Sequence, residues 1–93
     1  MTQTTIEIPP GEWTLLTNTD ITHASYQASG TSTVYIKGTA GATAPTDTDG
    51  AFSYTSGRGE VNQDIRELFL GVSGVNRLYG YSHTAAIVVI GHA

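Results

Sequence analysis

Cysteine is absent from the 93 residues of this chain. Its absence excludes a disulfide framework, thiolate nucleophiles and cysteine-based zinc sites, and it removes the usual sequence sign of an oxidising compartment. Long hydrophobic runs are absent too, because the longest, residues 85–90, is far below the roughly 20 residues needed to span a bilayer. Residues 1–5 show no basic segment followed by an apolar one. We therefore expect a soluble, unprocessed protein made in the cytoplasm, with no membrane partner.

Charged residues are scarce, at 13% of the chain, and most of them are acidic. Four Lys or Arg residues stand against eight Asp or Glu residues, which gives a net charge of −4. Surfaces that bind nucleic acid need clustered cations, whereas the cations here are scattered along the chain. We therefore expect no nucleic-acid partner. Polarity comes mainly from Thr, Ser, Gly, Asn and Gln, a composition that suits proteins packed into assemblies.

The length and the lack of an internal repeat predict one β domain over residues 1–93, with residues 1–10 as a possible N-terminal arm. A domain of this size buries only about 60 to 68% of the surface that its unfolded chain exposes. No disulfide compensates for the small core. We therefore expect association with other subunits to supply the missing burial.

Short strands bounded by turn residues are present, and they predict an all-β fold, a small antiparallel β-sandwich or barrel. The clearest alternation lies in residues 33–37, where Val34 and Ile36 point inward and their neighbours point outward. Residues 2–8 are expected to form an edge strand or an arm, which the following Pro-Pro pair ends. The other expected strands cover residues 13–17, 21–28, 51–55, 76–81 and 85–90.

One short helical turn is expected near residues 64–70. Asp64 and Glu67 have the spacing of a capping box, in which the Asp64 carboxylate accepts from the Glu67 N–H. Gly71 then limits the helix to two turns at most. The apolar side chains of this segment would close one end of the sandwich; they are Ile65, Leu68 and Phe69.

Residues of the hydrophobic core are predicted from the apolar positions of alternating strands. The run of apolar residues 87–90 has no polar alternation, which is typical of a strand covered on both faces. We expect the core to cover one face and a neighbouring subunit the other, in a homo-oligomer with a trimer favoured. The residues placed in the core are Val34, Ile36, Phe52 and Leu78.

Patterns of catalytic or metal-binding residues are missing. Three histidines, His23, His83 and His92, lie on separate expected elements without the spacing of a metal site. Asp47 and Asp49 begin a sequence like a calcium loop, but its Gly comes too early. No Gly-x-Ser-x-Gly nucleophile elbow occurs. We therefore expect no enzyme activity, no catalytic residue, no metal and no cofactor.

Aromatic residues leave a binding function open. Tyr79 and Tyr81 share one face of an expected strand, and exposed rings can present a stacking face for sugars. Inward-facing Tyr and Trp side chains are instead ordinary parts of a small β core or of a subunit interface. The residues that pose this choice are Trp13, Tyr26, Tyr35, Tyr54, Tyr79 and Tyr81.

A series of segments runs through most of the chain. It consists of the entry Trp13-Thr14-Leu15-Leu16, the strand Val34-Tyr35-Ile36, a loop closed by Ala44-Pro45-Thr46 and Gly50, and the strand Gly71-Val72-Ser73-Gly74-Val75-Asn76-Arg77-Leu78-Tyr79-Gly80. These segments, in this order, resemble the small all-β virion proteins of tailed bacteriophages. The resemblance implies a structural protein of the virion, made in the host cytoplasm. It would bind the capsid or other virion subunits as a decoration protein or as the base of a head fibre or spike.

Partner contacts are expected in two extended, polar segments, the arm 2–10 and the loop 38–49. In the arm, Ile6 and Ile8 would fill pockets on a neighbour whose sheet the arm extends, and the arm would contribute little to its own fold. The alternative function is a carbohydrate- or receptor-binding β module of a phage fibre, which rests on the aromatic residues and the polar loops. In the loop, the expected contact residues are Thr43, Pro45, Thr46 and Asp47.

Overall fold

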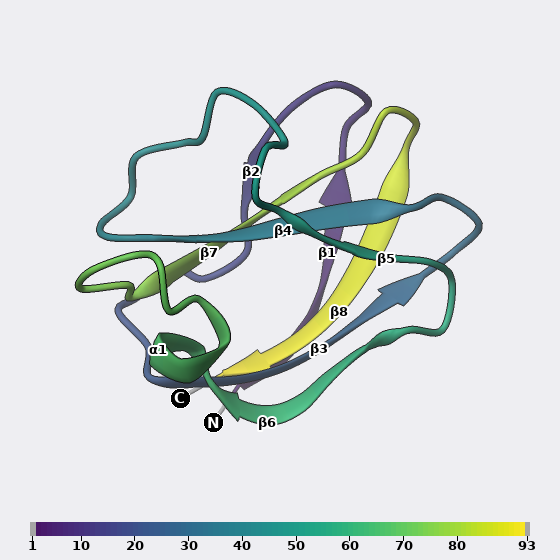
Figure 1. The fold of residues 1–93 in the computed structure, drawn as a ribbon. Coiled ribbons are helices and arrows are strands. Elements are labelled where there is room, and N and C mark those ends of the chain that lie inside the picture. Colours follow the sequence, from purple (N-terminus) through teal and green to yellow (C-terminus); the bar gives the residue numbers. More distant parts are fainter. Residues whose placement is uncertain (1, 93) are drawn as a thin grey trace.

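Two four-stranded antiparallel sheets pack face to face in the computed structural model of the protein, which describes residues 2–92, with side chains for residues 4–92 (Figure 1). The first sheet consists, in spatial order, of β1 (Thr2–Ile8), β8 (Ala86–His92), β3 (His23–Ser29) and β6 (Gly59–Asp64). The second consists of β2 (Thr14–Leu15), β7 (Arg77–Tyr81), β4 (Val34–Thr39) and β5 (Phe52–Tyr54). The predicted all-β fold with one short helical turn is confirmed, and it is a sandwich.

The hydrophobic core lies between the sheets, where alternate residues of each strand point inward. Val34, Ile36 and Leu78 are fully buried there, as predicted. The prediction that Phe52 belongs to the core is wrong, because this residue is 42% exposed. It lies on β5 at the edge of the second sheet, and its ring centroid is 5.3 Å from that of Phe69. An edge position leaves one side of its ring in solvent.

Residues 2–8 form a strand of the fold rather than an arm. β1 pairs with β8 in continuous register over its whole length. Ile8 is 1% exposed and belongs to the core, and Ile6 packs against that core. The expectation that this segment contributes little to the fold is therefore wrong. The two Ile side chains share one face of the strand, and the core of the same chain buries that face.

The apolar run 87–90 lies in β8, the strand between β1 and β3. Val88 and Ile90 are fully buried, whereas Ile87 is 38% exposed and Val89 is half-buried. Within this chain, the core therefore covers one face of the run. Cover for the other face by a second subunit stays a prediction.

β6 has no counterpart among the predicted strands. Its residues are mostly polar and show no apolar alternation, so no sequence pattern marked them as a strand. Backbone pairing with β3 holds this edge strand in the sheet. The pairing is irregular, since its register shifts between Ala24 and Tyr26 of β3. Asn62 in β6 also has a positive φ of 49°.

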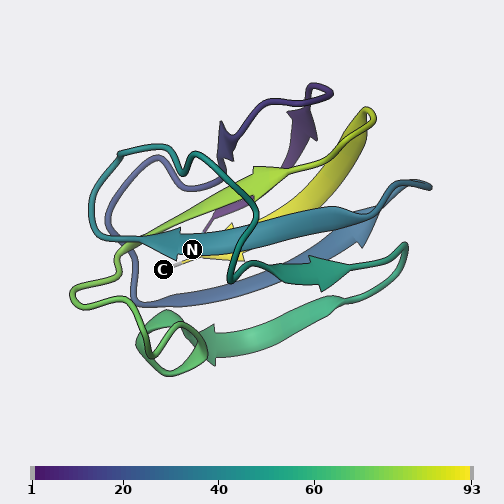
Figure 2. The same cartoon turned by 45° about the horizontal axis from the view of Figure 1, so that its top comes forward.

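The helix α1 (Ile65–Leu68) closes one end of the sandwich, next to the end of β6 (Figure 2). Ile65 and Phe69 are buried in the core and Leu68 packs against it, as expected. Asp64 caps the helix, but its carboxylate accepts from the Arg66 N–H at 2.9 Å. The predicted pairing with the N–H of Glu67 is therefore wrong. The guanidinium of Arg66 also holds the carboxylate, at 2.7 Å, and turns it toward that residue.

A truncation of the inward face of β4 tests the assignment of the core. Ile36→Ala is expected to lower the free energy of unfolding by about 2 to 5 kcal/mol, because it leaves a cavity between the sheets. Leu70→Ala is the matched control, since Leu70 is 84% exposed and its truncation should cost less than about 0.5 kcal/mol. Denaturant unfolding of both variants provides the measurement. Equal effects of the two truncations would show that the face is wrongly assigned.

A methyl group added at Gly59 tests the close approach of β6 to β3. A Cβ there would overlap the carbonyl oxygen of Tyr26 and lie 2.7 Å from Cα of Gln27, both of them backbone atoms that cannot turn aside. Gly59→Ala should therefore destabilise the fold by about 1 to 3 kcal/mol or more. Gly71→Ala should be tolerated, because a Cβ at that position meets nothing within 4 Å. Thermal melting of the two variants would contradict this packing if their midpoints were the same.

Candidate functional site

Four ring-bearing residues cluster on the outer side of the second sheet; we call this cluster the aromatic face, and it consists of Trp13, Tyr35, Tyr81 and His83. Tyr35 points outward because its neighbours on β4, Val34 and Ile36, point into the core. It pairs in register with Tyr81 of the adjacent strand β7. Strand pairing therefore brings together residues that are far apart in the sequence.

The rings of the aromatic face contact one another. Trp13 and Tyr81 have centroids 5.2 Å apart at a 40° tilt. His83 stands nearly perpendicular to both Tyr81 and Tyr35, with centroid distances of 5.3 and 5.7 Å. The three larger side chains are half-buried and His83 is exposed. Such geometry is that of favourable aromatic pairs, each worth about 0.5 to 1.5 kcal/mol, so the surface is held in one arrangement before any partner binds.

The loop between β4 and β5 turns back toward β4 (Figure 2), where its residue Asp47 contacts Lys37 of that strand. Lys37 of β4, which pairs in register with Tyr79, places its Nζ 3.4 Å from Asp47 Oδ1 in this loop. Tyr79 is only 5% exposed although it lies outside the main core cluster. The aromatic face thus borders the loop that sequence reasoning proposed for partner contacts.

The cations on this side of the second sheet are paired. Lys37 is held by Asp47, and Nε of Arg77 lies 2.9 Å from Asp20 Oδ1. Since Arg77 is opposite Thr39 in the register, it belongs to the outward row of β7. The aromatic face is therefore flanked by neutralised pairs, which favours contact with an uncharged surface rather than with an anion.

The six residues predicted to bind partners do not form one site. Ile6 and Ile8 lie on β1 in the first sheet, and Ile8 is buried in its own core, so it cannot fill a pocket on a neighbour. The others lie in the loop that follows β4 of the second sheet. There Pro45 is half-buried and the rest are exposed; these are Thr43, Thr46 and Asp47.

The sequence did not show which of the aromatic residues lie in the core and which lie at the surface. Tyr26 and Tyr54 belong to the core, and Tyr79 is buried although it lies in the outward row of β7, opposite Lys37. The alternation of residues 33–37 did indicate that Tyr35 points outward. No sequence signal showed that His83, in a turn, completes the cluster. The rings at the surface are those of Trp13, Tyr35 and Tyr81.

A series of hydrogen bonds links three side chains from β3, β5 and β6; they are Tyr26, Tyr54 and Glu60. The two hydroxyls are 2.7 Å apart, and the Tyr54 hydroxyl donates to Glu60 Oε2 at 3.1 Å. Tyr26 therefore donates to Tyr54, because the carboxylate only accepts. Burial raises the pKa of Tyr26 well above its usual range and raises that of Tyr54 to about 12. Neither phenol ionises near neutral pH, so the series is structural rather than nucleophilic.

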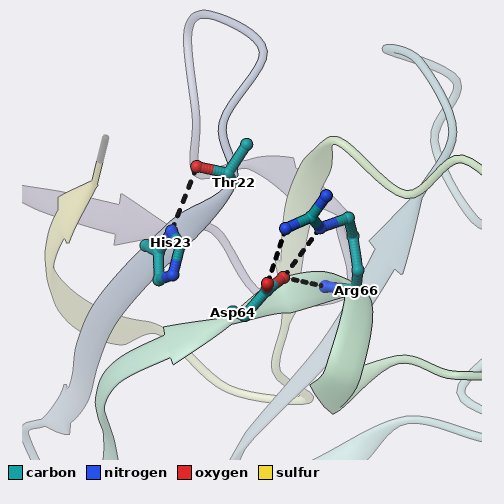
Figure 3. A network of polar contacts seen from close by, with 4 residues as sticks. All are labelled: Thr22, His23, Asp64 and Arg66. Carbon is teal, nitrogen blue, oxygen red and sulfur yellow. Dashed lines mark hydrogen bonds and ion pairs between the residues drawn. The ribbon is translucent and has the colours of Figure 1, made fainter.

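Asp64 and Arg66 form a second polar cluster, at the start of α1, shown in Figure 3. Hydrogen bonds from the side chain and the backbone N–H of Arg66 lower the pKa of Asp64 to about 2. Beside them, Thr22 Oγ1 lies 3.1 Å from Nδ1 of His23, the residue opposite Asp64 in the strand register. A carboxylate so fully ionised and paired is a helix cap and a poor general acid or base.

Metal-binding clusters and membrane-spanning helices are not found in the described part of the chain. Over residues 2–92, no three His, Cys, Asp or Glu side chains gather as a metal site would require. The Asp47 carboxylate instead accepts from the N–H of Asp49 at 3.2 Å, which makes a turn of the loop. In the same range, no helix is long and apolar enough to cross a membrane.

Comparison of the chain with protein-family models, with curated proteins and with solved structures found no match. Function must therefore be inferred from the surface itself.

The raised pKa values of the buried phenols predict a loss of stability at alkaline pH. Their folded-state pKa values lie above the unfolded value of about 10, so the folded state holds these protons more tightly. Their contribution to stability is complete below about pH 10 and falls as the pH rises through 10 to 12, by at most roughly 1.4 kcal/mol per pH unit for each phenol.

Denaturant unfolding of the parent and of the double variant Tyr26→Phe/Tyr54→Phe between pH 8 and about pH 11.5 provides the measurement. The parent should lose stability more steeply than the double variant above about pH 10. Parallel profiles would mean that these hydroxyls are not protected by the fold.

Proposed function

We propose that this protein is a non-catalytic structural protein of the virion of a tailed bacteriophage, and that it binds another virion subunit through the aromatic face. The observation that carries the binding role is the cluster of three half-exposed rings on one sheet face. The phage context rests on the resemblance of the sequence. The following features support the choice of a protein partner.

The side chains of this surface are those that dominate protein interfaces. Trp, Tyr and Arg are enriched at binding hot spots, whereas Lys and Glu are depleted from the core of an interface. The aromatic face has Trp13, Tyr35 and Tyr81, and Arg77 lies on the same side of the sheet. The nearby Lys37 is already engaged by Asp47. A partner that covered this surface would bury large rings without leaving a cation unpaired.

The rings are also mounted on a rigid support. Tyr35 and Tyr81 lie on paired central strands of the second sheet, and Trp13 lies directly before β2. Contacts between the rings restrict their rotamers before binding. Binding costs less when the side chains are already ordered, so a small surface of this kind can bind a partner tightly.

The loop residues named from sequence extend this surface. Thr43, Pro45, Thr46 and Asp47 belong to the loop whose Asp47 reaches Lys37 beside the aromatic face. We include them in the contact as its polar rim, which is the usual arrangement around a hydrophobic interface centre. Ile8 is excluded, because it is part of the core.

A second candidate function uses the same rings. Half-exposed Tyr and Trp side chains combine an apolar ring with a polar group and can stack on sugars, as expected of a carbohydrate- or receptor-binding module of a fibre. The perpendicular packing of His83 against Tyr35 and Tyr81 weakens this alternative, because it leaves fewer open ring faces parallel to one another. Glycan titration of the purified protein distinguishes the two functions.

Substitution of two large side chains of the aromatic face, Trp13 and Tyr81, tests the proposed role. In phage carrying Trp13→Ala/Tyr81→Ala, the amount of this protein in purified particles should fall strongly, because loss of one hot spot weakens binding by about 2 kcal/mol, or roughly 30-fold. Val61→Ala is the matched control: Val61 is 80% exposed on β6, at the edge of the other sheet, and its truncation should leave incorporation unchanged.

Thermal melting of the purified variants is compared first, so that an unfolded variant is not mistaken for one that fails to bind. Normal incorporation of the double variant would contradict the aromatic face as the contact. Absence of the parent protein from purified particles would contradict the virion role itself.

A further inference from the structure

The four edge strands of the sandwich differ in how they are protected from pairing with another chain. An edge strand presents unpaired N–H and C=O groups, and proteins protect such edges by short strands, bulges, charges or proline. β2 has two residues and β5 has three. β6 is longer, but its pairing register shifts and Asn62 adopts a positive φ of 49°. These three edges are poor templates for an added strand.

β1 is less protected than the other three edges. It has seven residues and pairs with β8 without a break in register. Its sequence, Thr-Gln-Thr-Thr-Ile-Glu-Ile, contains no Lys and no Pro, and Glu7 is its only charge. Among the described residues, β8 is its only strand neighbour. Antiparallel pairing uses one alternate set of its backbone groups, and the other set points away from the sheet.

A cleft of about 290 Å³ lies beside this edge, between β1 and β2. Thr4 and Ile6 line it from β1, and Leu15 and Leu16 line it from β2 and the residue after it. Ile6 and Leu15 are only half-buried. A strand added to β1 would thus gain backbone hydrogen bonds along the edge and apolar contacts in the cleft, the two components of strand-addition interfaces.

We propose that a second copy of this chain occupies the edge, with the two β1 strands antiparallel about a two-fold axis at Thr5. In this register Thr4 is opposite Ile6 of the second copy, and position 3 is opposite Glu7. The two Glu7 carboxylates therefore do not face each other, which would be unfavourable across a strand pair. Each Ile6 comes to lie beside Thr4, a residue that lines the cleft of the other copy. The register thus places no like charges opposite each other and brings each Ile6 to the cleft of the other copy.

The pairing creates one continuous sheet from the two first sheets. Because the two-fold axis is perpendicular to that sheet, both second sheets lie on the same side of it. The aromatic faces of the two copies then point in the same direction, so their two contacts to one surface would reinforce each other. A two-fold pairing makes a dimer, in place of the trimer expected from sequence.

Charge placed at the two-fold axis tests this pairing with the purified protein and independently of any virion partner. Thr5 is exposed in the single chain, but it faces the other Thr5 across the proposed axis. Thr5→Lys and Thr5→Glu should each weaken the dimer at least about tenfold, because like charges meet directly. An equimolar mixture of the two variants should restore a two-chain species. Val61→Lys, on the edge strand β6, is the matched control and should leave association unchanged.

Sedimentation equilibrium over a concentration series measures the mass of each sample. The parent should show a two-chain mass that falls to one chain on dilution. A single-chain mass at every concentration, a three-chain mass, or a dimer that neither Thr5 variant weakens would overturn the proposal. Failure of the mixture to restore the dimer when each variant alone is monomeric would overturn the register about Thr5.

Discussion

Burial of one face of β8 is the constraint on which the first sheet depends. Val88 and Ile90 are fully buried against the second sheet, and β8 pairs along its length with β1 on one side and β3 on the other. A one-residue slip of β8 would turn these two side chains into solvent, so its register is strongly specified. The positions of β1 and β3 follow from it, and with them the burial of Ile8 and Tyr26.

The alternation of side chains along each strand also decides which residues lie on the outer surface of the second sheet. In β4 and β7, packing of Val34, Ile36 and Leu78 in the core leaves Tyr35 and Tyr81 on the opposite side. The surface with the strongest binding character is therefore a consequence of how the core is packed. The open edge of β1 has a similar origin. Its inward side chains hold it in the sheet, while among the described residues no strand pairs with its outer backbone groups.

Much of the architecture could be predicted from local patterns. Alternating residues indicated most of the strands and the buried positions Val34, Ile36 and Leu78, and Asp64 marked the start of the helix. The prediction failed where the pattern is weak. β6 is polar and is held by pairing with β3, while Phe52 alternates correctly but lies on an edge strand. Which strands are edges is a property of the sheet order, which no local pattern contains.

The sequence by itself determined the all-β class, the inward and outward alternation of its clearest strands, and the scarcity of charge, because these depend on residue types and on a period of two. Only the tertiary structure decided that β1 is a strand of the core sheet, that Trp13, Tyr35, Tyr81 and His83 meet, and that Tyr79 is covered. These facts require pairing between segments that are distant in the chain. Such pairing is selected by the burial of the whole core rather than by any one segment.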